Sequence, residues 1–128
     1  MTQEDKELIF KELCARLPYH VKCKIWLKDG TTEEGALDLE HNYGNVLQDS
    51  FYYNKIKDIK PYLFPLSSMT EEEKEEYCQL QQRVIYNSKG VINEDVTKYI
   101  NWCYKKHLDI NNLIPMELAI DATNLNIY

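Results

Sequence analysis

The sequence predicts an α+β fold: an N-terminal helix, then a small antiparallel β-meander of three to four strands, then two to three C-terminal helices packed on it. Three observations predict this fold. Residues 2–17 have helical spacing, residues 21–28 alternate apolar and polar side chains directly before Asp29-Gly30, and residues 67–107 contain two more helical patterns.

Length and composition predict one domain over residues 1–128, because 128 residues with 44% apolar content are enough for a single core. We expect the helix within 1–18, the sheet within 20–66 and the helical portion within 67–128. The apolar runs are only a few residues long, which excludes a membrane span and a secretory signal.

The first helix is predicted to begin at Thr2, since Asp5 follows at capping-box spacing, and to end at Pro18. Its expected inner face holds Leu8, Ile9, Leu13, Cys14 and Leu17, and its other faces hold Glu7, Lys11, Glu12 and Arg16.

The first strand is predicted at residues 21–28, with Val21, Cys23, Ile25 and Leu27 on one face and Lys22, Lys24, Trp26 and Lys28 on the other. Asp29-Gly30 is a strong hairpin signal, so a partner strand should run from Glu33 to Glu40. A third, short strand is expected between Val46 and Tyr53.

The segment from Ile56 to Leu66 has apolar positions typical of burial, but it contains Pro61 and Pro65. Proline is incompatible with a helix interior and with a central strand. We therefore expect an edge strand or an extended crossing segment here.

Two helices are predicted in the C-terminal half. The first runs from Glu71 to Tyr86, because Thr70 and Glu73 have capping-box spacing. The second runs from about Asn93 to His107. The last twenty residues are expected to form a turn, a short helical turn and a tail.

Several stretches resemble a group of short uncharacterised proteins of gut Bacteroidales, of apparent prophage or mobile-element origin. The most specific are Ile59-Lys60-Pro61-Tyr62-Leu63 and Pro65-Leu66-Ser67-Ser68-Met69-Thr70. The group has glycine in place of His20 and arginine in place of Phe64. The resemblance implies a mobile-element lineage and a bacterial cytoplasm, and it implies no activity.

The outer face of the first strand combines a basic stripe with an aromatic ring, as single-stranded nucleic-acid binders do. Nearby residues repeat this combination. The candidate nucleic-acid or partner surface therefore comprises Lys22, Lys24, Trp26, Lys28, Tyr52, Tyr53, Lys55, Lys57, Lys60 and Tyr62. The favoured interpretation is an ordinary solvated strand face, because Glu34, Asp38 and Glu40 of the partner strand could neutralise the stripe.

A second candidate partner surface is acidic and consists of Glu71, Glu72, Glu75 and Glu76. Such a run is also typical of the exposed first turns of a helix. Eight of the ten tyrosines exceed what a small core usually absorbs, which suggests that several lie on a homodimer or partner surface; tyrosines at a partly solvated core boundary are an equally good explanation. The eight are Tyr43, Tyr52, Tyr53, Tyr62, Tyr77, Tyr86, Tyr99 and Tyr104.

No catalytic motif is present, and no cofactor or metal is expected. The four cysteines are too far apart in sequence for a paired metal motif, so each is predicted to be a small buried thiol.

These observations favour a non-enzymatic interaction or adaptor protein in the cytoplasm, with a small single-stranded nucleic-acid-binding module as the alternative. The expected partner is an unknown host or phage protein, or a second copy in a homodimer. Nucleic acid is disfavoured by the net charge of −6, and no membrane is expected.

Overall fold

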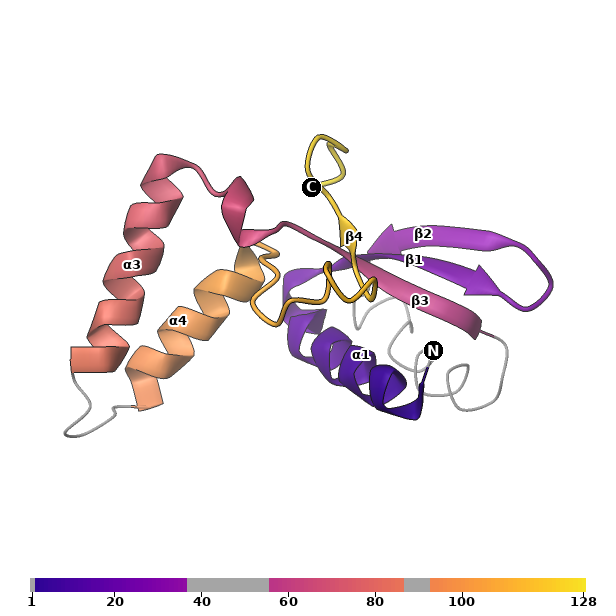
Figure 1. The fold of residues 1–128 in the computed structure, drawn as a ribbon, viewed down its shortest axis with the longest axis horizontal. Helices are drawn as coiled ribbons and strands as arrows, with labels where there is room; N and C mark the ends of the chain where they lie inside the picture. Colours follow the sequence, from indigo (N-terminus) through magenta and orange to yellow (C-terminus); the bar gives the residue numbers. More distant parts are fainter. Residues whose placement is uncertain (1, 37–55, 87–92) are drawn as a thin grey trace.

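The computed structural model describes residues 2–36, 56–86 and 93–128. The fold is α+β, as predicted: an N-terminal helix, a four-strand mixed sheet and two C-terminal helices packed together (Figure 1). In chain order the elements are α1 (Gln3–Arg16), the 3-10 turn η1 (Leu17–Tyr19), β1 (Lys22–Leu27), β2 (Thr32–Ala36), β3 (Ile56–Leu63), the 3-10 turn η2 (Leu66–Ser68), α3 (Glu71–Tyr86), α4 (Asn93–Lys105) and β4 (Ile120–Asp121).

Helix α1 begins as predicted with a capping box. The Asp5 backbone N–H donates to Thr2 Oγ1 over 3.0 Å, and the Thr2 N–H donates to Asp5 Oδ2 over 3.2 Å. Ile9 and Leu13 of this helix are fully buried against the sheet core.

Three residues of α1 depart from the predicted pattern. Glu12 and Arg16, expected on the outer faces, are 3% and 0% exposed. Their charges are compensated, because Arg16 Nε donates to Glu12 Oε2 over 2.8 Å and Arg16 Nη2 donates to Leu108 O over 2.7 Å. Cys14, expected on the inner face, is exposed.

Strands β1 and β2 form the predicted antiparallel hairpin, with Lys24 opposite Glu34 and Trp26 opposite Thr32. Gly30 adopts a φ of 90°, a conformation that favours glycine, and Asp29 Oδ1 accepts a 2.8 Å hydrogen bond from the Thr31 N–H. The remainder of the expected partner strand and the expected strand at Val46 to Tyr53 lie outside the described residues.

Strand β3 corrects the prediction of an edge strand or crossing segment, since it lies between β1 and β4. Pro61 is tolerated in this inner strand because the pairing of β3 with β4 begins only after it. Pro61 lies opposite Cys23 of β1, whereas the residues of β3 that pair with β4 are Tyr62 and Leu63. The ladder with β4 therefore requires no N–H from Pro61.

The sheet has the order β2-β1-β3-β4, and it is mixed rather than purely antiparallel because β4 runs parallel to β3. β4 comes from the segment that was expected to be a turn and tail. It is held by its pairing with β3 and by the Ala122 N–H, which donates to Leu63 O over 2.8 Å.

Helix α3 has the predicted bounds and the predicted capping box, in which the Glu73 N–H donates to Thr70 Oγ1 over 3.1 Å. Helix α4 ends at Lys105 rather than His107, because His107 takes a left-handed backbone with φ 56°. The main contacts of the two helices are with each other and, through α4, with α1, rather than with the sheet as predicted. The inner face of the sheet is already covered by α1, so the α3–α4 hairpin stands to one side of the sheet (Figure 1).

In the part of the chain that the structure describes, no helix has the length and apolar character needed to cross a membrane.

Candidate interaction surfaces

Two strands together form the outer face predicted from the sequence. The β1–β3 register places Lys24 opposite Lys60 and Trp26 opposite Asp58. We call the residues gathered there the lysine–tryptophan face: Lys22, Lys24, Trp26, Lys60 and Tyr62. Of the other residues predicted for this surface, Lys28 and Lys57 are exposed near the strand ends, and Tyr52, Tyr53 and Lys55 lie outside the described residues.

The Trp26 ring carries two cations. Lys24 Nζ lies 5.3 Å from the ring centroid and Lys60 Nζ lies 5.7 Å from it. Both distances are within the range of a cation–π interaction. The indole itself is half-buried.

Glu34 of β2 partly neutralises this face, as the favoured interpretation of the sequence expected. Its Oε1 lies 4.0 Å from Lys24 Nζ and accepts a 2.8 Å hydrogen bond from the Tyr62 hydroxyl. Burial and this bond to Glu34 raise the pKa of Tyr62 to about 12. Asp38 and Glu40 lie outside the described residues.

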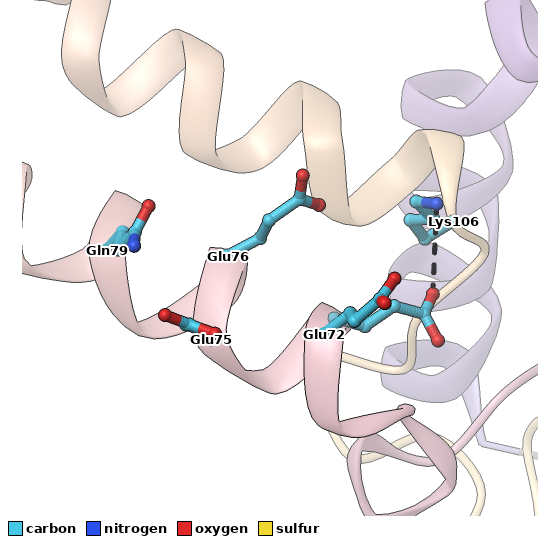
Figure 2. A pocket seen from close by; sticks show the side chains of 6 residues that line it. Glu72, Glu75, Glu76, Gln79 and Lys106 are labelled. Carbon is cyan, nitrogen blue, oxygen red and sulfur yellow. Dashed lines mark ion pairs between the residues drawn. The ribbon is translucent and has the colours of Figure 1, made fainter.

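The predicted acidic surface lies on the first turns of α3, and we call Glu71, Glu72, Glu75 and Glu76 the acidic face. All four are exposed. A hollow of about 370 Å³ lies at this position, and Figure 2 shows the side chains that line it. The hollow is lined by Glu72, Glu73, Glu75, Glu76, Gln79 and Lys106.

The carboxylates of α3 differ in how they are compensated. Glu73 lies 3.8 Å from Lys106 Nζ, Glu71 lies 3.4 Å from Lys74 Nζ, and Glu76 accepts a 3.1 Å hydrogen bond from Trp102 Nε1. The side chains of Glu72 and Glu75 have no ion pair or hydrogen bond with any described residue. These two carboxylates therefore remain available to a partner.

Four of the tyrosines considered for an interface have described side chains, and all four contact other parts of the chain. The Tyr99 hydroxyl donates to the Tyr77 hydroxyl over 3.1 Å, and the Tyr104 ring lies 4.7 Å from the guanidinium carbon of Arg16. Tyr62 is buried. This arrangement is the one expected of tyrosines at a core boundary. Tyr43, Tyr52 and Tyr53 lie outside the described residues, as does the side chain of Tyr86.

A buried polar cluster around Arg16 was not expected from the sequence. Besides pairing with Glu12, the guanidinium lies over Tyr104, and Asn111 Nδ2 donates to Glu12 Oε1. Arg16 Nη1 has no partner among the described residues. The four-residue spacing of Glu12 and Arg16 was the available signal, since it places both side chains on one side of a helix.

The contacts of Tyr128 were not expected either, since the sequence placed this residue only in a tail. Its hydroxyl accepts from the Lys22 backbone N–H and donates to Tyr62 O, each over 2.8 Å. The ring stacks on His107, with centroids 3.7 Å apart and planes 14° apart, and lies 5.7 Å from the Phe64 ring. We call Lys22, Tyr62, Phe64 and His107 the Tyr128 seat.

Burial and nearby positive charges set the proton affinity of His107. Desolvation, Arg16 and Lys22 lower the pKa of His107 from 6.5 to about 4. His107 is therefore neutral at pH 7, which suits its stacking on Tyr128.

The cysteines are free thiols and divide into two kinds. Cys23 and Cys103 are buried, as predicted, and Cys14 and Cys78 are exposed, which corrects the prediction for these two. Burial raises the pKa of Cys23 and raises that of Cys103 to about 11, so neither is an activated thiolate. Within the described residues, no group of three or more histidine, cysteine, aspartate or glutamate side chains is placed to hold a metal ion.

The chain matches no protein-family model, no curated protein and no solved structure. Its function is therefore inferred from the surfaces described above.

Proposed function

We propose that the chain is a non-enzymatic interaction or adaptor protein whose acidic face binds a basic segment of a host or phage protein. The observation that carries this proposal is the pair of exposed carboxylates on Glu72 and Glu75, which have no partner among the described residues. The proposal includes the mobile-element lineage and cytoplasmic location that the sequence resemblance implies.

The placement of the acidic face supports this function. Helix α3 carries five glutamates against Lys74 and Arg83, and the α3–α4 hairpin stands beside the sheet, where a partner can approach it (Figure 1). Unpaired surface charges of one sign attract oppositely charged partners and speed their association. Binding should therefore weaken as the salt concentration rises.

Capture of a partner from bacterial lysate tests the proposal when it is combined with matched variants. Glu72→Gln/Glu75→Gln removes two charges from the acidic face. Glu7→Gln/Glu33→Gln removes two charges from exposed positions on α1 and β2 and serves as the control. We expect the wild type and the control to retain the same protein in a salt-sensitive manner and the α3 variant to lose it.

Two results of the capture experiment would contradict the proposal. One is a wild type that retains nothing above background. The other is a captured protein that the α3 variant holds as well as the control does.

Single-stranded nucleic-acid binding is the second candidate function, and the observation that favours it is the pair of lysine ammonium groups at the Trp26 ring. It ranks second because both Lys22 and Lys24 are engaged within the chain: Lys22 Nζ donates to Ile127 O, and Lys24 pairs with Glu34.

Tryptophan fluorescence tests this second function. If it is correct, single-stranded oligonucleotides quench the emission in a salt-sensitive manner, Trp26→Phe abolishes the quenching, and Trp102→Phe preserves it. The absence of quenching at micromolar concentrations of protein and oligonucleotide would eliminate this function.

A further inference from the structure

In the Tyr128 seat, the phenol hydroxyl both accepts and donates a hydrogen bond, and both partners are backbone groups. The Lys22 N–H of β1 supplies the donor, and Tyr62 O of β3 supplies the acceptor. These two strands are hydrogen-bonded neighbours, and the hydroxyl bridges them at one end of their ladder. A phenylalanine ring in the same place would leave one donor and one acceptor without this partner.

The seat also recognises the aromatic ring itself. His107 provides a stacking plane, Phe64 provides a tilted aromatic contact, and Lys22 Nζ lies 5.7 Å from the centroid of the Tyr128 ring. Because burial and the neighbouring charges lower the pKa of His107 to about 4, the stacking plane is uncharged at neutral pH. The seat thus combines a stacking plane, a cation and a directed pair of polar backbone groups, all positioned by β1, β3 and the end of α4.

The seat is partly open to solvent, and most of the segment that leads to Tyr128 lies at the surface. Hydrogen bonds also hold this segment at Ala122, Thr123, Leu125 and Ile127. Tyr128 is 42% exposed and lines a hollow of about 450 Å³ together with Phe64, His107 and Met69. Residues 123–126, which lead to it from β4, are exposed. Two of them, Asn124 and Asn126, adopt left-handed backbone conformations with φ of 66° and 53°.

We propose that the Tyr128 seat is a recognition site for a tyrosine side chain, which the chain's own Tyr128 occupies in this conformation and for which a tyrosine-bearing peptide of a partner protein competes. Tyr128 itself shows which chemistry the seat accepts. The seat shares no residue with the acidic face of α3, although Glu73 and Lys106 line both neighbouring hollows. The proposed site therefore goes beyond the function proposed above and stands without it.

Removal of the resident side chain tests the proposal. Tyr128→Ala should create a vacant seat that binds N-acetyltyrosinamide saturably in calorimetry. It should bind N-acetylphenylalaninamide about 30-fold more weakly, the ratio that corresponds to loss of the two hydrogen bonds that the hydroxyl makes. The wild type is the matched control, and it should bind N-acetyltyrosinamide more weakly than the variant does, because Tyr128 competes for the seat.

Two results with folded Tyr128→Ala protein would overturn the proposal: no saturable binding of N-acetyltyrosinamide, or equal affinity for the tyrosine and phenylalanine compounds. If Tyr128→Ala does not fold, Tyr128→Phe provides the decisive readout. The Lys22 amide proton resonance should then shift on loss of the hydroxyl and move back toward its wild-type position as N-acetyltyrosinamide is added. A resonance that does not move back would overturn the proposal in that case.

Discussion

At the scale of single residues, the cluster around Arg16 links the two halves of the molecule. Its guanidinium belongs to α1, yet it bonds to the carbonyl oxygen of Leu108, just beyond α4, and lies over the ring of Tyr104. A buried charge that loses its partner is costly, so both members of the Glu12–Arg16 pair are needed together.

Arg16→Met should destabilise the fold by about 3–5 kcal/mol, because it leaves the Glu12 carboxylate buried without its cation. Glu12→Gln/Arg16→Met should cost less than the single change, since it removes both charges. The free energy of unfolding in urea measures both effects. A double variant less stable than the single variant would contradict this account of the pair.

His107 should make the stability of the fold depend on pH. In the folded chain its pKa lies near 4, whereas the unfolded chain has the ordinary value near 6.5. The unfolded state therefore binds the proton more readily, and the free energy of unfolding should fall as the pH drops from about 6.5 to about 4. Above pH 6.5 this group should contribute no pH dependence.

Denaturation at a series of pH values measures this effect. In His107→Asn, the free energy of unfolding should vary less with pH between about 4 and 6.5. Asparagine does not titrate, and it tolerates the left-handed backbone at this position. Gln79→Ala, at an exposed position without an ionisable group, should leave the slope unchanged. An unaltered slope in His107→Asn would refute the assignment.

At the scale of elements, the helix caps, strands and turns that depend on residues close together in sequence match the prediction. The elements whose position depends on pairing with distant residues do not. The caps at Thr2 and Thr70, the alternation in β1 and the Asp29-Gly30 turn each depend on residues within a few positions of one another. β4 and the place of β3 inside the sheet depend on pairing with distant segments, which local patterns do not encode.

The same distinction applies to the candidate surfaces. The lysine–tryptophan face and the acidic face follow from strand alternation and from one helical run, so they were predictable. The contact of Tyr128 with Lys22 joins residues 106 positions apart, and no periodicity indicates it. The burial of Glu12 and Arg16 likewise depends on a carbonyl oxygen 92 positions beyond Arg16.

Thr70 should stabilise the first turn of α3, where the acidic face lies. Thr70→Ala removes the hydroxyl that accepts from the Glu73 N–H and should destabilise this end by about 1 kcal/mol. Hydrogen exchange at the first amides of α3 measures the loss. Thr70→Ser retains a hydroxyl and should restore protection, so equal exchange in the two variants would count against the cap.

At the scale of the whole molecule, the charge is divided between two regions. The lysine–tryptophan face lies on the sheet, and the acidic face lies on the helical hairpin beside it (Figure 1). The lysines on the sheet are largely engaged by Glu34, Trp26 and Ile127, whereas Glu72 and Glu75 have no partner among the described residues. Among the described residues, the densest group of exposed negative charges therefore lies on α3.

The most direct measurement of the central proposal is site-specific photo-crosslinking in living bacterial host cells. A benzophenone side chain would replace Gln79, beside Glu72 and Glu75 on α3, or exposed Lys11 on α1 as the control. The account predicts one defined protein adduct from position 79 and none of that mass from position 11. An adduct of equal yield from both positions, or none from position 79, would contradict it.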